Sequence, residues 1–170
     1  MAIFFDFGDT LCDEATEVKD ESQTTLRAAL IPGAAELVRE IKRRGFPLAL
    51  VADGRPGTYR NVLGQHGLYD LFDVVAVSEE VGREKPDPRL FEYALQGLGI
   101  SPEAYGRVVM VGNHLERDVK GANRLGLVSV WLDWAPRRPK VPADAWEIPD
   151  YTLKEPLQLL DLLDRLCGNG

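Results

Sequence analysis

Short, continuous apolar runs recur along the chain, and each ends at a polar or charged residue. Runs without polar alternation are typical of strands that are covered on both faces of a sheet. They predict five strands, and a short sixth strand is expected near the C-terminus at 151–153. The five expected strands cover residues 3–5, 47–52, 73–78, 108–111 and 128–132.

Between these runs, apolar residues recur every three or four positions, which is the spacing of a helix with one buried face. In the segment 88–98, for example, Leu90, Phe91 and Ala94 share a face and Gly99 ends the helix. Strands that alternate with helices indicate an α/β fold, with a doubly wound parallel sheet in three α/β/α layers. Further helices are expected between Gly33 and Gly45 and over 56–66, 115–125 and 157–166.

The composition indicates an ordinary soluble protein, and one domain is expected over residues 1–170. Its formal net charge of -7 disfavours binding to nucleic acid or to a membrane surface, because polyanions would be repelled. Cys12 and Cys167 form no spacing motif for a disulfide framework or a zinc site. No stretch reaches the length of a membrane span and no signal peptide is recognisable, so a cytoplasmic location is expected.

Chemically useful side chains follow four of the expected strands. Asp6 follows the first, Asp53 the second, Lys85 the third, and Asn113 with Asp118 the fourth. Because the carboxyl ends of parallel strands meet in one crevice, these side chains are expected to converge. A nucleophilic carboxylate, a lysine and a further acid suit phosphoryl transfer through an aspartyl phosphate, with Mg²⁺ neutralising the phosphoryl oxygens.

Four stretches resemble the motifs of the haloacid dehalogenase superfamily of hydrolases, in the family's order and spacing. They are FFDFGDTL, LALVADG, SEEVGREKPDPRLF and VVMVGNHLERDVKGANRLGL, and they cover most of residues 3–127. The resemblance implies a Rossmann-like core with its strands, numbered along the chain, in the order 5-4-1-2-3. It also implies a hydrolase, and more narrowly a magnesium-dependent phosphatase.

The resemblance assigns roles to individual residues. Asp6 is expected to be the nucleophile, and Lys85 is expected to hold both the phosphoryl group and Asp6. The expected magnesium ligands are Asp6, the carbonyl group of Gly8, Asn113 and Asp118, and the expected phosphate-binding positions are Ala52, Asp53, Gly54 and Lys85.

Three positions depart from the family's pattern. Gly8 stands where phosphatases have a general acid, which is typically worth ~10²–10⁴-fold in rate. The nearest acid is Asp9, one position later, and it is the candidate replacement. Ala52 stands where a Ser or Thr would donate to phosphate, a loss of about 1.5–3 kcal/mol if nothing replaces it. Asn113 removes one negative charge from the metal site.

These departures leave three interpretations open. The first is a working phosphatase with a restricted scope, such as good leaving groups, acting on a small phosphate ester or a phosphorylated macromolecule. The second is a catalytically impaired protein that acts through binding. The third, a dehalogenase-type hydrolase, also lacks the general acid but carries a substantial cap. The oligomeric state is open, and a homodimer is compatible with the sequence.

The spacing of the motifs leaves little room for a cap domain. Residues 12–31 must hold the family's flap, so they have space for little more than one acidic helix over 20–30. The acids of segment 13–21 are expected to form a solvated face. Arg137 and Arg138, after the fifth strand, are expected to anchor a loop rather than to edge the crevice. A protein with no cap, or almost none, is the prediction.

Overall fold

The computed structural model describes residues 1–168 and has a six-stranded sheet at its centre. All neighbouring strands are parallel, in the order β5-β4-β1-β6-β7-β8. The first five strands along the chain therefore have the order expected from the motifs, and β8 adds the short sixth strand beside β7. The strands are β1 (Ala2–Phe5), β4 (Leu48–Ala52), β5 (Val74–Val77), β6 (Val108–Gly112), β7 (Val128–Leu132) and β8 (Tyr151–Leu153).

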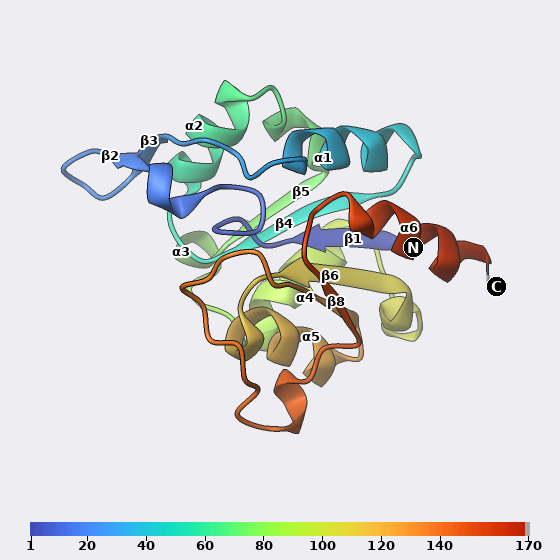
Figure 1. The fold of residues 1–170 in the computed structure, drawn as a ribbon. Coiled ribbons are helices and arrows are strands. Elements are labelled where there is room, and N and C mark those ends of the chain that lie inside the picture. Colours follow the sequence, from blue (N-terminus) through green and yellow to red (C-terminus); the bar gives the residue numbers. More distant parts are fainter. Residues whose placement is uncertain (169–170) are drawn as a thin grey trace.

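Helices cover both faces of the sheet (Figure 1). In β1, Ile3 and Phe5 pack towards one helical layer, and Ala2 and Phe4 pack towards the other. This alternation confirms the three-layer arrangement predicted from the continuous apolar runs. The first layer has α1 (Ala34–Arg43), α2 (Pro56–Gln65) and α6 (Gln158–Gly168), and the second has α4 (Pro88–Gly97) and α5 (Lys120–Leu125).

Several short helical segments complete the fold. A single α-helical turn, α3 (Ser78–Val81), follows β5 directly. The 3-10 turns are η1 (Glu14–Thr16), η2 (Tyr69–Leu71), η3 (Pro102–Arg107) and η5 (Ala145–Glu147). None of the helices within residues 1–168 has the length and apolarity to cross a bilayer.

The segment after β6 differs from the single regular helix expected over 115–125. It begins as a π-helical turn, η4 (Leu115–Val119), and continues as α5. The carbonyl of His114 accepts hydrogen bonds from the amides of both Asp118 (2.8 Å) and Val119 (3.3 Å). The second of these bonds spans five residues and widens the turn. Such turns are frequent at functional sites.

The acidic helix expected over 20–30 is absent, and this prediction was wrong. The flap, residues 12–31, instead contains η1 and an antiparallel hairpin of β2 (Val18–Lys19) and β3 (Thr25–Arg27). The Asp20 carboxylate accepts the amides of Ser22 (2.8 Å) and Thr24 (3.0 Å), and Gln23 has a φ of 67°. These features form a turn that a helix would not allow. Figure 1 shows the hairpin beside α2, where the amide of Thr25 donates to the Thr58 hydroxyl (3.0 Å).

Candidate active site

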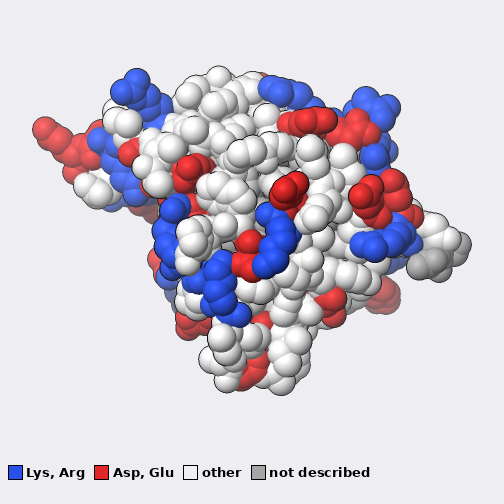
Figure 2. Space-filling view, viewed as in Figure 1, with Lys and Arg blue, Asp and Glu red and all other residues white. Residues whose placement is uncertain are grey.

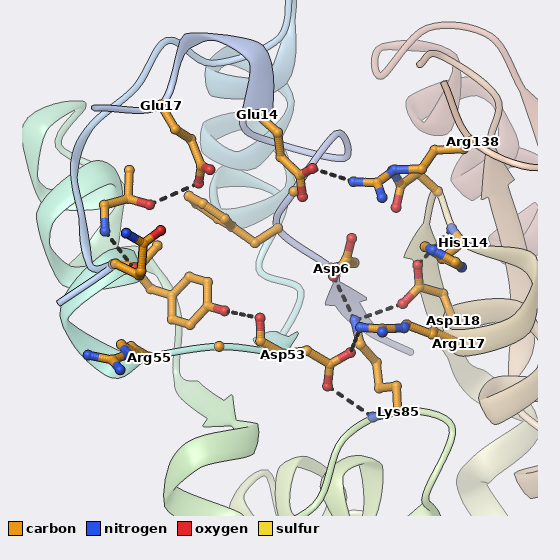
Figure 3. A pocket seen from close by; sticks show the side chains of 18 of the residues that line it. Asp6, Glu14, Glu17, Asp53, Arg55, Lys85, His114, Arg117, Asp118 and Arg138 are labelled. Carbon is orange, nitrogen blue, oxygen red and sulfur yellow. Dashed lines mark hydrogen bonds and ion pairs between the residues drawn. The ribbon is translucent and has the colours of Figure 1, made fainter. Parts of the chain in front are cut away.

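A cavity of about 410 Å³ lies at the carboxyl ends of β1, β4 and β6. The flap forms one wall, and the loop after β7 reaches it through Arg138 (Figure 3). The strand-end residues expected to converge do so here, apart from Ala52 and Asp9, which are not part of the lining. The lining residues that followed from the motifs are Asp6, Gly8, Asp53, Gly54, Lys85, Asn113 and Asp118.

Lys85 lines the cavity, and its ammonium group lies between the carboxylates of Asp6 and Asp118. Its Nζ is 2.6 Å from Asp6 Oδ1 and 2.7 Å from Asp118 Oδ1, and it also donates to the Val51 carbonyl at 2.8 Å. The residue is only 4% exposed. Burial alone would lower the pKa of Lys85, but the Asp118 and Asp6 carboxylates outweigh burial and hold this pKa above its ordinary value. Lys85 is therefore a fixed positive charge shared by two acids.

The two acids beside Lys85 differ in their access to the cavity. The Asp6 side chain is 13% exposed, whereas the Asp118 side chain is 1% exposed. Both Asp6 oxygens are held, because Oδ1 contacts Lys85 and Oδ2 accepts the Thr10 hydroxyl at 3.1 Å. Asp6 is consequently the oriented carboxylate that faces the cavity.

Asp118 packs directly against the end of β6. A Cβ atom at Gly112 would lie 2.2 Å from Asp118 Oδ2, so a glycine is needed for this close approach. The same Oδ2 accepts the amide of His114 at 2.9 Å. Burial raises the pKa of Asp118, the nearby Asp6 adds to the rise, and Lys85 opposes it.

The prediction that Asp9 replaces the missing general acid has to be corrected. Asp9 is fully buried, and its backbone has a left-handed φ of 53°. Its carboxylate accepts Arg137 Nε at 2.9 Å and lies 3.1 Å from Arg138 Nη2. The acid is thus turned towards the loop after β7 and away from the cavity. The two arginines are loop anchors as expected, although Arg138 also lines the cavity.

The end of β4 offers less to a phosphate than the resemblance implies. The Ala52 side chain is buried in the core. The amide of Gly54 already donates to the Ser78 hydroxyl at 2.9 Å. Asp53 accepts the amide of Lys85 at 2.9 Å and lies 3.3 Å from Arg117 Nη1. Burial raises the pKa of Asp53, and the charge of Lys85 opposes this rise. Asp53 therefore tethers the segment that carries Lys85.

Two flap acids, Glu14 and Glu17, line the cavity, although the sequence indicated a solvated face for this segment. Glu17 accepts the Thr25 hydroxyl at 2.9 Å, while Glu14 pairs with Arg138. Burial raises the pKa of Glu14, Arg138 opposes the rise, and Asp9 and Asp6 add to it. No local sequence pattern marks either acid, because Glu14 lies in the single 3-10 turn η1 and Glu17 directly follows it, and both are placed by contacts distant in the sequence.

The cavity combines both signs of charge. Besides Lys85, it is lined by Lys19, Arg55, Arg117 and Arg138, which were not predicted to take part. Figure 2 shows Lys and Arg side chains intermingled with Asp and Glu on the face it displays, with no broad patch of a single sign. A cavity lined by both signs of charge can contact a ligand that itself carries charge.

Magnesium prefers oxygen ligands and is commonly held by one or two carboxylates together with phosphate oxygens. Asp6 and Asp118 meet at one Lys85 ammonium, and Asn113 and Gly8 line the same cavity. This all-oxygen donor set fits such an ion once a phosphate contributes. Within residues 1–168 no group of three or more His, Cys, Asp or Glu side chains is placed to hold a metal by itself.

Comparison with known proteins identifies several relatives. The chain is 33% identical over 136 residues to a glyceraldehyde 3-phosphate phosphatase of Methanopyrus kandleri, covering 80% of this chain and 57% of the relative. It is 41% identical over 124 residues to a phosphoserine phosphatase of Thermus thermophilus, covering 73% and 47%. The chain thus spans about half the length of the curated relatives it matches.

A solved structure of an uncharacterized protein from Listeria monocytogenes serotype 4b superposes with a TM-score of 0.69 at 26% identity. The match covers 96% of this chain and 99% of that chain, so the fold also occurs in a protein of similar length. The family model of haloacid dehalogenase-like hydrolases matches residues 18–126, which is well over half of the chain. The sequence motifs, the strand order and these matches together show that the chain belongs to the haloacid dehalogenase-like hydrolases.

Proposed function

We propose that the protein is a phosphatase that hydrolyses a small phosphate ester through an aspartyl phosphate on Asp6. The observation that carries this proposal is the Asp6 carboxylate, which faces the cavity with both oxygens held, by Lys85 at 2.6 Å and by Thr10 at 3.1 Å. A nucleophile oriented in this way needs little further ordering to attack. The names of two relatives, a glyceraldehyde 3-phosphate phosphatase and a phosphoserine phosphatase, support the same reaction class.

In this reaction an Asp6 oxygen forms a bond to phosphorus, and the ester oxygen leaves with the electron pair of its own bond to phosphorus. Lys85 stabilises the charge on the phosphoryl oxygens, since it is buried beside the reacting group and its raised pKa favours the ammonium form. Water then releases phosphate and restores Asp6. Magnesium, held by Asp6, Asn113, Asp118 and the carbonyl of Gly8, would supply further neutralisation of the phosphoryl oxygens.

The size and charge of the cavity support a small substrate. A volume of about 410 Å³ accommodates a compact phosphate ester. Arg55 and Arg117 line the cavity with side chains that are 46% and 43% exposed, so they can meet a charged group of the substrate. We also propose that residues 1–170 work as one core domain in which residues 12–31 serve as the flap. The cytoplasmic location and the absence of nucleic-acid and membrane partners stay predictions, and the oligomeric state stays open.

The test is hydrolysis of p-nitrophenyl phosphate with Mg²⁺ by the wild type and Asp6→Asn. We expect turnover by the wild type and none by the variant, together with beryllofluoride binding that depends on Asp6. Asp161→Asn, an exposed change on α6, is the matched control and should keep full activity. Equal rates for the wild type and Asp6→Asn would refute the proposal. A wild type that is inactive with every metal and pH tried, but still binds phosphate, would favour the binding protein instead.

A further inference from the structure

The space that a side chain at position 8 would occupy is taken by a residue of the flap. A Cβ atom added to Gly8 would lie 1.9 Å from Glu14 Oε1 and 2.7 Å from Glu14 Cδ. Gly8 is not among the residues with a positive φ, so its backbone does not require a glycine. What the glycine provides is space, and the carboxylate of Glu14 occupies it. Figure 3 shows Glu14 entering the cavity from the flap, on the same cavity as Asp6.

Several contacts hold Glu14 in this position. Asp13 caps η1 by accepting the amide of Ala15 at 3.0 Å. The amide of Glu14 donates to Asp9 Oδ1 at 3.2 Å. Glu14 Oε2 pairs with Arg138, which leaves Oε1 as the oxygen nearest to Gly8. The buried Asp9 therefore acts as a positioning residue, because it fixes both the start of η1 and the arginine that contacts Glu14.

We propose that Glu14 is the general acid and base of this protein, and that it takes over from the flap the task that a side chain at residue 8 performs in related phosphatases. This inference rests on the proposed phosphatase activity. Gly8 lies two residues after the nucleophile, so a carboxyl group in the place of its side chain is close to the ester oxygen of a phosphate held at Asp6.

The proton movements balance over one cycle. Protonated Glu14 gives its proton to the leaving ester oxygen as the bond from that oxygen to phosphorus breaks, which produces an alcohol and an ionised Glu14. The Glu14 carboxylate then takes a proton from water while the water oxygen attacks the phosphorus of the aspartyl phosphate. The bond between phosphorus and Asp6 breaks, so inorganic phosphate, an ionised Asp6 and a protonated Glu14 result.

The other flap acid on the cavity is less suited to this role. Glu17 accepts the Thr25 hydroxyl at 2.9 Å and pairs with Lys19 at 2.9 Å, so both its oxygens are engaged in the hairpin. Neither of these contacts brings it to the position beside Gly8. Glu14 is thus the carboxylate that the geometry assigns to proton transfer.

The decisive measurement is the dependence of kcat/KM on the leaving group for Glu14→Gln. kcat/KM reports the steps up to release of the alcohol, and an acid matters most when that alcohol is weakly acidic. We expect Glu14→Gln to lose ~10²–10⁴-fold with alkyl phosphates and far less with p-nitrophenyl phosphate or acetyl phosphate. Glu21→Gln, an exposed acid in the turn of the same flap, should behave as the wild type with every substrate.

A second experiment moves the acid from Glu14 to residue 8. Gly8→Asp combined with Glu14→Ala places a carboxylate on residue 8 and clears the space for it, and we expect it to regain alkyl phosphate hydrolysis relative to Glu14→Ala alone. Gly8→Ala displaces the Glu14 carboxylate and should show the same leaving-group dependence as Glu14→Gln. If kcat/KM of Glu14→Gln fell equally with all leaving groups, or did not fall, the role of Glu14 would be overturned. The phosphatase proposal would still stand in that case, provided that the activity depends on Asp6. A wild type inactive on every ester, or activity independent of Asp6, would overturn both.

Discussion

Replacing Lys85 by methionine is expected to cost more stability than any surface substitution. The change keeps most of the side-chain volume but removes the ammonium group that lies 2.6 Å from Asp6 and 2.7 Å from Asp118. Two buried carboxylates then face each other without a cation, and the Val51 carbonyl loses its donor. Leaving a buried charge unpaired costs about 3–5 kcal/mol, out of a total stability of about 5–15 kcal/mol.

Urea unfolding in EDTA measures this cost directly. At about 2–4 °C per kcal/mol for a chain of this size, Lys85→Met should also lower Tm by about 6–20 °C. Adding Asp6→Asn and Asp118→Asn should return part of the loss, since neutral groups no longer need the cation. The control is Lys154→Met, because the Lys154 side chain is 66% exposed and Asp133 keeps its second partner, Lys140, so a loss of about 0–1 kcal/mol is expected. The reasoning would be refuted if Lys85→Met lost no more stability than Lys154→Met, or if Asp6→Asn and Asp118→Asn restored none of the lost stability.

Two further changes test the packing and the surface charges. Gly121→Ala should lower the free energy of unfolding in urea by about 1–3 kcal/mol, although alanine has the better helix propensity. The new Cβ atom would lie 2.4 Å from the buried ring of Phe91, so adding Phe91→Leu should restore part of the lost stability. Burial acts to raise the pKa of Asp73, but the hydrogen bonds from Lys42 and the Leu48 amide outweigh it and lower the pKa. The contribution of Asp73 is therefore present above its unfolded pKa and lost as the pH falls through the lower folded value. Asp73→Asn should lose about 0.2–1 kcal/mol at neutral pH and converge with the wild type in acid, and a gap that persists in acid would contradict this.

The core strands could be predicted because each is a continuous apolar run, which is a local and repeated signal. The order of the strands in the sheet followed from the resemblance of the motifs to a known family and not from these local signals. The hairpin of the flap could not be predicted in this way. Its strands, Val18–Lys19 and Thr25–Arg27, are too short to show a period of two. They depend instead on the turn at Asp20 and on contacts with α2, far along the chain.

The same distinction between local and long-range signals applies to the residues of the candidate site. Asp6 and Lys85 follow core strands, so their convergence could be predicted from topology alone. The direction of Asp9 could not, because it depends on Arg137, which is 128 residues away in the sequence. The role of Glu14 was equally hidden, since it requires both the fold of the flap and the space beside Gly8.

The shared volume of Gly8 and Glu14 also has an evolutionary consequence. A side chain at residue 8 and the carboxylate of Glu14 exclude each other, so a substitution at one position has an effect that depends on the residue at the other. A lineage that exchanges one arrangement for the other must pass either through a form with both residues, in which one is displaced, or through a form with neither. Residue 8 alone is thus a poor marker of lost activity among relatives of this protein, and the two positions are informative only as a pair.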